Sequence, residues 1–348
     1  MILLRSLQRT INPPPQRCIA CKEKAEEYVG CKTCKVSSYC SDHCRQVHLR
    51  DHRRHCREVH AARKKARREK GKLISKIGRE TFHEQTGILW ATPDARAYCS
   101  ALEDLGKKFE QLGKKSDDIV ALAAAANMFS ELLVSNRGDE QVTRFIYPFA
   151  LMALSKLKES YNFVIWCSTV FEGFIYVSDF ASWPRAPWIF RTDDLLEDLT
   201  KNAQKQVDLE SMELPHLLAV TLLKAVFVKT IDGDGRPMKC FEDVMQRADE
   251  QKKILRAYMQ AVGNTDEVMQ RGDEQKKILR AYMQSVGKTN KHAYGVLAGQ
   301  LKLEELPAEH SSEVVVRGSP AEAREVLGVA DYVVRKFELL DVLKKYSE

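Results

Sequence analysis

The stretch CIACKEKAEEYVGCKTCKVSSYCSDHCRQVHLRDHRRHC, from Cys18 to Cys56, decides the fold of the N-terminal part of this chain. It contains four pairs of metal-ligand side chains at short spacing: Cys18-x2-Cys21, Cys31-x2-Cys34, Cys40-x3-Cys44 and His52-x3-Cys56. Zn²⁺ takes four ligands in a tetrahedron, and a complete shell of thiolates and imidazoles is typical of structural sites. Eight ligands therefore predict two structural zinc ions.

The two kinds of spacing predict two kinds of local structure. A Cys-x2-Cys pair fits a tight turn that points both sulfurs at one metal. Ligands four residues apart lie one helical turn apart, so we expect the pairs Cys40/Cys44 and His52/Cys56 on helices. A module of this size has little apolar core, and we expect zinc to supply its folding free energy.

This region resembles the MYND-type zinc finger in the gaps between its ligands and in the Tyr-Cys-Ser sequence at 39–41. The resemblance implies a cross-braced pairing, in which the ligands of the two ions alternate along the chain. The first zinc would be held by Cys18, Cys21, Cys40 and Cys44, and the second by Cys31, Cys34, His52 and Cys56.

The HIT-type finger is a close alternative, because Cys44, His48, His52 and Cys56 are spaced by four throughout. A shift of one helical turn would let His48 and His52 act as ligands instead. That shift would leave Cys56 as a free thiol, so we favour His52 and Cys56.

MYND fingers bind short proline-rich peptides in a shallow groove beside their second helix. The resemblance therefore implies a protein-interaction module. The Gln, Asp and Trp that the family carries in this region are replaced here by Arg45, His48 and Leu49. Losing the Trp removes a large contact surface, and the surrounding arginines indicate a more acidic peptide.

Basic charge is concentrated at the N-terminal end. Residues 1–80 contain 21 Lys and Arg against 8 Asp and Glu, and the other 268 residues contain 34 against 40. Residues 57–90 are predicted to form a basic helix or linker. We favour a solvent-exposed helix that extends the finger, since no aromatic residues alternate with the basic ones. The alternative is a nucleic-acid-associated factor that contacts phosphates through this stretch.

The predicted fold is a small two-zinc, cross-braced finger followed by a mostly α-helical, repeat-like domain at residues 91–348. Ser116 is the expected N-cap of a helix from Asp117 to Leu133. Residues 150–166 (ALMALSKLKESYNFVIW) weakly resemble a tetratricopeptide helix pair. This resemblance implies a scaffold that holds a peptide of a partner protein.

One segment of the helical part is duplicated. Residues 243–266 match residues 267–290 at 19 of 24 positions. In each copy the apolar residues follow a helical spacing that predicts one buried side, for example Leu279, Tyr282 and Met283 in the second copy. We interpret the repeat as a local duplication that added a helical arm, because solenoids need at least three repeats to share a core.

The sequence carries no recognisable catalytic motif. The Asn-His and Gly-Glu-Glu motifs of the SET-domain methyltransferases with MYND fingers are not found, nor is G-x-S-x-G, a P-loop or a dinucleotide glycine motif. No apolar run reaches the roughly 20 residues that cross a bilayer. Seven of the ten cysteines lie in the ligand motif, which favours a reduced compartment.

We therefore predict a zinc-binding adaptor between proteins, without catalytic residues and with short peptide segments as its partners. Nucleic acid is the less favoured partner, and no membrane partner is expected. The cytoplasm or nucleus is the expected location. Residues 1–17 are expected to form an N-terminal tail, although their arginines also resemble a weak mitochondrial presequence.

Overall fold

The structure is a computed structural model that divides the chain into two compact units. Unit 1 comprises Met1–Ala150 with Ile175–Pro187, and unit 2 comprises Leu151–Phe174 with Trp188–Glu348. Within them the structure describes residues 17–84, 92–135, 143–168, 214–232, 279–284 and 320–341, together with Leu89, Lys277, Val286 and Leu343. No helix in these described parts is long and apolar enough to cross a membrane.

A small antiparallel hairpin lies near the start of unit 1. It pairs β1 (Val29–Gly30) with β2 (Ser38–Tyr39), and Val29 lies opposite Tyr39. The residues of β1 are exposed, whereas those of β2 are buried. Tyr39 packs there with Cys18 and Ile19, so this hairpin has only a minimal apolar core.

A single helix of 36 residues, α2 (Asp42–Ile77), follows the hairpin. Ser41 is its N-cap, and the Ser41 hydroxyl accepts a hydrogen bond from the Cys44 N–H at 3.2 Å. Such a cap satisfies one of the backbone donors that the first helical turn leaves open. The helix then runs without a break through the ligand pair His52/Cys56 and through the basic stretch to Ile77.

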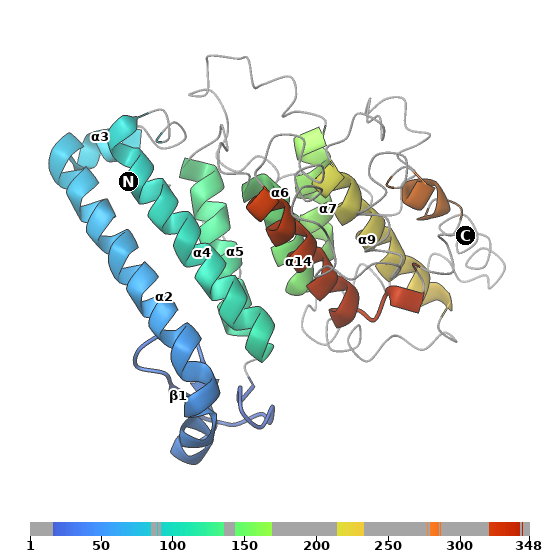
Figure 1. Cartoon of the computed structure of the whole chain (residues 1–348), viewed down its shortest axis with the longest axis horizontal. Helices are drawn as coiled ribbons and strands as arrows, with labels where there is room; N and C mark the ends of the chain where they lie inside the picture. Colours follow the sequence, from blue (N-terminus) through green and yellow to red (C-terminus); the bar gives the residue numbers. More distant parts are fainter. Residues whose placement is uncertain are drawn as a thin grey trace. The chain divides into compact units, whose positions relative to one another are not determined.

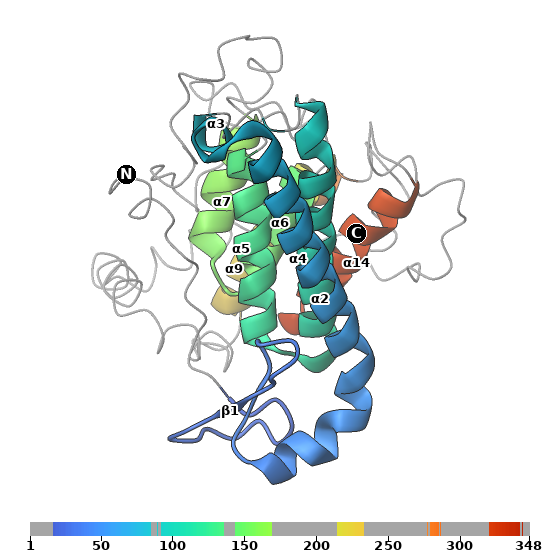
Figure 2. The same ribbon diagram turned by 90° about the vertical axis from the view of Figure 1, so that its left-hand side faces the viewer.

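Three helices of unit 1 pack side by side. α4 (Arg96–Ser116) lies along α2, and α5 (Ile119–Ser135) lies along α4 (Figure 1, Figure 2). The buried positions of α2 include His52, Cys56, Val59, Ala66 and Leu73. Their separations of four, three, seven and seven residues follow a heptad, the spacing with which one helix packs along another.

Two basic residues occupy the remaining positions of this heptad. The Arg63 guanidinium lies 5.2 Å from the centre of the Phe109 ring, and the Lys70 ammonium lies 5.3 Å from Phe82 and 5.5 Å from Tyr98. Contacts of this kind let a cation sit over an aromatic face while its aliphatic stem packs. The basic stretch is thus a helix with one packed face, and only its other face is exposed.

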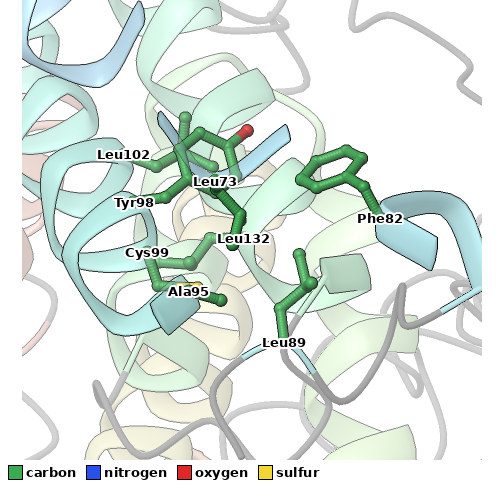
Figure 3. Packing of buried hydrophobic residues seen from close by; sticks show 8 residues of the cluster. All are labelled: Leu73, Phe82, Leu89, Ala95, Tyr98, Cys99, Leu102 and Leu132. Atoms are coloured by element: carbon green, nitrogen blue, oxygen red, sulfur yellow. The ribbon is translucent and has the colours of Figure 1, made fainter. Parts of the chain in front are cut away.

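The end of α2 away from the hairpin is closed by an apolar cluster. Its residues come from α2, from α3 (Arg79–Glu84), from η2 (Pro93–Ala95) and from the helices α4 and α5, with Leu89 between α3 and η2. Figure 3 shows the cluster: Leu73, Phe82, Leu89, Ala95, Tyr98, Cys99, Leu102 and Leu132.

The connection between α4 and α5 is very short. Asp117, with φ 46° and ψ 47°, ends α4. One carboxylate oxygen of Asp118 then accepts hydrogen bonds from the N–H groups of Val120 at 3.0 Å and Ala121 at 3.2 Å. The prediction that Ser116 caps this helix is therefore wrong, because α4 continues through Ser116 and the capping carboxylate lies two residues later.

The remaining helices are α6 (Thr143–Ala153), α7 (Leu157–Trp166), α9 (Leu214–Asp232) and α14 (Pro320–Lys336). In unit 2, α7 and α14 each pack against α9. The described residues of the second duplicated copy include Leu279, Tyr282, Met283 and Val286, and all four are buried. This agrees with the buried side that the sequence predicts, whereas the first copy lies outside the described residues.

Candidate metal centre

Each Cys-x2-Cys pair forms the same tight turn. The Lys22 N–H donates to the Cys18 carbonyl at 2.8 Å, and the Lys35 N–H donates to the Cys31 carbonyl at 2.9 Å. Lys22 and Lys35 both lie in the left-handed region, with φ of 65° and 59°. Two separate parts of the sequence therefore reverse direction in the same way and leave their sulfurs close together.

The other two pairs use the start of α2. Cys40 directly precedes the N-cap Ser41, and its sulfur lies 3.5 Å from that of Cys44 in the first helical turn. Cys40 is therefore not on the helix, in contrast to the expectation from its spacing, because the chain must leave β2 and form the cap first. His52 and Cys56 do lie one turn apart on α2.

The eight residues gather into two clusters of four. One contains Cys18, Cys21, Cys40 and Cys44, and the other contains Cys31, Cys34, His52 and Cys56. Within each cluster the ligand atoms all lie within 4.8 Å of one another. This is the alternating grouping that the MYND resemblance implies.

The distances within the clusters fit a tetrahedral zinc ion. Zn–S bonds of about 2.3 Å place two sulfurs of a tetrahedron about 3.8 Å apart, and a Zn–N bond of about 2.0 Å places sulfur and nitrogen about 3.5 Å apart. The Cys21–Cys40 and Cys31–Cys56 sulfur pairs are each separated by 3.6 Å. Cys34 Sγ lies 3.5 Å from His52 Nε2. The thiolate and imidazole donor set is also the one that zinc prefers.

His48 belongs to neither cluster. Its Nδ1 lies 3.2 Å from the Tyr39 hydroxyl, and its ring centre lies 5.6 Å from that of His52. The side chain thus packs beside the second cluster and hydrogen-bonds with the buried Tyr39. This arrangement favours His52 and Cys56 over the shifted, HIT-like ligand set.

Closely spaced thiols shift one another's pKa in both directions, and the pKa is raised for Cys21, Cys40, Cys44 and Cys56. Burial raises the pKa of Cys18, but hydrogen bonds from the backbone of Cys21, Cys40 and Ala20 outweigh burial and lower it to about 6. Burial also lowers the pKa of His52, yet the neighbouring Cys31 and Cys34 outweigh it and raise the pKa to about 9. The negative potential that holds a proton on His52 would equally attract a divalent metal ion.

The two clusters differ in exposure. In the second cluster Cys34, His52 and Cys56 are buried, whereas in the first cluster only Cys18 is buried and Cys21 is exposed. The more exposed cluster lies where the chain enters the hairpin. We therefore expect ligands of the first cluster to be reached more easily by a chelator.

The region from Cys18 to Cys56 is also tied to the helical part of unit 1. The Ser37 hydroxyl donates to the second carboxylate oxygen of Asp118 at 2.8 Å. The Lys22 ammonium donates to the Ser116 carbonyl at 2.7 Å. Ser37 and Asp118 were not singled out by the sequence, since nothing in the local pattern links residues so far apart.

Comparison of the chain with protein-family models, with characterised proteins and with solved structures finds no match to any of them.

Proposed function

We propose that the protein is a zinc-binding adaptor between proteins, in which a MYND-like finger binds a peptide segment of a partner. The observation that carries this proposal is the complete donor set of the two clusters. Four protein ligands on each ion leave no position for a substrate, which is the mark of a structural rather than a catalytic zinc site. Cys18, Cys21, Cys40 and Cys44 would hold one ion, and Cys31, Cys34, His52 and Cys56 the other.

Exposed aliphatic side chains on the finger support a peptide-binding role. Val47 is 65% exposed and Leu49 is 54% exposed, both in the first turns of α2, and Val29 on β1 is 37% exposed. Residues two apart on a helix point to different sides, so Val47 and Leu49 are available to a partner separately rather than as one patch. Leu49 stands where the resemblance places a peptide-binding Trp. The exposed Arg50 beside it favours a peptide that also carries acidic residues, whereas Arg45 pairs with Asp42 at 2.8 Å.

The hydrogen bonds from Ser37 and Lys22 to the α4–α5 connection support the adaptor aspect of the proposal. A finger held on a helical body presents its partner in a fixed position relative to that body. In the proposal the helices of unit 2 provide a second, scaffold-like binding part, and the tetratricopeptide resemblance of residues 150–166 remains a prediction.

An array of peptides tests the proposal. The zinc-loaded full chain is applied to proline-rich peptides with and without acidic flanks, and binding is then measured for Leu49→Glu and Gln46→Glu. Both residues are exposed on α2 and both variants change the charge by one unit. Binding lost in Leu49→Glu and kept in Gln46→Glu supports the proposal, whereas a wild-type protein that binds no peptide of either class contradicts it.

A further inference from the structure

The helix α2 carries an unusual density of positive charge. Of its 36 residues, thirteen are Lys or Arg and only four are Asp or Glu. The zinc clusters and the packing of α2 on α4 account for only a few of these Lys and Arg residues. Arg63 and Lys70 face the aromatic rings of the packed side, and most of the others lie elsewhere on the helix.

Six of the remaining eleven basic residues form one stripe. At 100° per residue, the buried positions Val59, Ala66 and Leu73 fall on one side of the helix. The opposite side, called the outward face here, is lined by Arg50, Arg54, Arg57, Lys64, Arg68 and Lys72. The acidic residues between Arg50 and Lys72, which are Asp51, Glu58 and Glu69, fall on one flank rather than on the outward face.

Residues of the outward face are open to solvent. The side chains of Arg54, Arg68 and Lys72 are 83%, 63% and 64% exposed, although Arg54 pairs with Glu58 at 3.4 Å and Glu69 pairs with Arg68 at 2.8 Å and with Lys72 at 3.2 Å. Arg50, Arg57 and Lys64 are exposed too, and they form no ion pair with any residue that the structure describes. Six basic residues against the two paired acids, Glu58 and Glu69, leave the face with a net positive charge. Exposed excess charge of one sign creates a field that attracts a polyanion.

The stripe is also held in place. Arg50 and Lys72 lie about 33 Å apart along the axis, at 1.5 Å per residue. Packing of Val59, Ala66 and Leu73 against the rest of unit 1 fixes the helix on its other side. This length is close to one turn of a nucleic-acid duplex, about 34 Å.

The amino-acid composition of the outward face indicates which class of polyanion it can bind. Sequence-independent binding of single strands relies on aromatic side chains on which bases stack, and Phe, Tyr and Trp are missing between Arg50 and Lys72. A basic helix on a membrane buries its apolar side in the lipid, but that side of α2 is packed. A protein partner gains most from apolar and aromatic anchors, which this face does not offer.

We propose that the outward face of α2 binds the phosphate backbone of a nucleic-acid duplex without reading its sequence. Evenly spaced Arg and Lys side chains contact successive phosphates and release their counterions. This role goes beyond the proposed adaptor function and does not depend on peptide binding by the finger.

Fluorescence anisotropy of the zinc-loaded full chain with a labelled 20-base-pair duplex, measured over a range of salt concentrations, tests the proposal. About five phosphate contacts predict a slope of log K against log salt of roughly −4.5. The double variant Lys64→Glu/Arg68→Glu is expected to bind at least about tenfold more weakly and to lose about two units of slope.

A matched control distinguishes the effect of the stripe on binding from the effect of net charge. Lys24→Glu/Arg79→Glu changes the net charge by the same amount at two exposed residues outside α2, and it is expected to weaken binding less than about threefold. Circular dichroism checks that both variants stay folded. Equal weakening in both variants overturns the proposal, because net charge alone would then explain the binding.

Other polyanions complete the test. A single strand of the same length, vesicles containing phosphatidylserine and a poly-glutamate peptide are titrated under the same conditions. The proposal expects the duplex to bind most tightly and every ligand to be weakened in the stripe variant. Tighter binding of any of the three other ligands overturns the assignment of the face to a duplex.

Discussion

Ser37, next to β2, donates a hydrogen bond of 2.8 Å to Asp118, which is 81 residues later and caps α5. Both side chains are buried, with Ser37 0% and Asp118 6% exposed. The two oxygens of the Asp118 carboxylate thus accept hydrogen bonds from different parts of the chain. One satisfies the N–H groups at the start of α5, and the other joins the finger to the helices.

The first prediction concerns this carboxylate. Asp118→Ala removes a helix cap and leaves the buried Ser37 hydroxyl without its acceptor. We therefore expect it to lower the free energy of unfolding of unit 1 by about 2–3 kcal/mol. Ser37→Ala leaves the cap intact but removes the donor to a buried oxygen, and should cost about 1–2 kcal/mol. Urea denaturation of the zinc-loaded protein measures both.

The control is Ser116→Ala. Ser116 contributes its backbone carbonyl to Lys22, and the substitution keeps that group. We expect a change within about 0.5 kcal/mol. A loss of 1 kcal/mol or more in Ser116→Ala, with little loss in Asp118→Ala, would contradict the placement of the cap and restore the prediction made from the sequence.

The metal centre was the part of the structure most accessible from the sequence. Ligand spacing predicted the two Cys-x2-Cys turns and the helical pair His52/Cys56, because these are local patterns with local geometry. It was wrong for Cys40, which precedes the N-cap although Cys40-x3-Cys44 has the helical spacing. The alternating grouping came from the family resemblance, and the two clusters reproduce it. The bond from Ser37 to Asp118 could not be predicted, because it depends on how two distant segments pack.

The packed face of α2 was missed although a signal for it exists. His52, Cys56, Val59, Ala66 and Leu73 follow a heptad, but Arg63 and Lys70 occupy two of its positions and hide the repeat among basic residues. A cation at such a position needs partners on the neighbouring helices, such as aromatic rings or, for Lys70, also the Glu131 carboxylate at 3.7 Å. Those rings come from other helices, Phe109 and Tyr98 on α4 among them.

The second prediction concerns the close approach of α4 and α5. A Cβ on Gly113 would lie 2.6 Å from Leu122 Cγ and 3.0 Å from the Leu122 backbone nitrogen. Since a backbone atom cannot give way easily, we expect Gly113→Ala to destabilise unit 1 by about 1–3 kcal/mol.

Gly71 provides the matched comparison, because a Cβ there meets nothing within 4 Å. Gly71 lies within the exposed part of α2, so Gly71→Ala should stabilise by about 0.5–1 kcal/mol. Thermal denaturation of the two variants side by side measures the difference. Equal effects would show that α4 and α5 do not approach each other this closely.

The third prediction concerns zinc stoichiometry. Elemental analysis of purified wild-type protein should give two zinc ions per chain. His52→Ala removes one ligand of the buried cluster, so its zinc content should fall toward one. His48→Ala should keep two ions, because His48 hydrogen-bonds with Tyr39 and lies outside both clusters. Loss of zinc in His48→Ala alone would favour the HIT-like ligand set.

The fourth prediction concerns the response of α2 to a chelator. The first part of α2 has few packing partners besides the clusters, whereas Val59, Ala62, Ala66 and Leu73 are buried on the side that packs along α4. Removal of zinc should therefore unfold the hairpin and the helix as far as about Cys56, and leave the helix from Val59 to Ile77 formed, since its stability comes from packing.

Hydrogen exchange of the zinc-loaded and EDTA-treated protein should show protection lost up to Cys56 and kept beyond it. Loss of protection throughout α4 and α5 would instead mean that the metal sites stabilise the whole of unit 1.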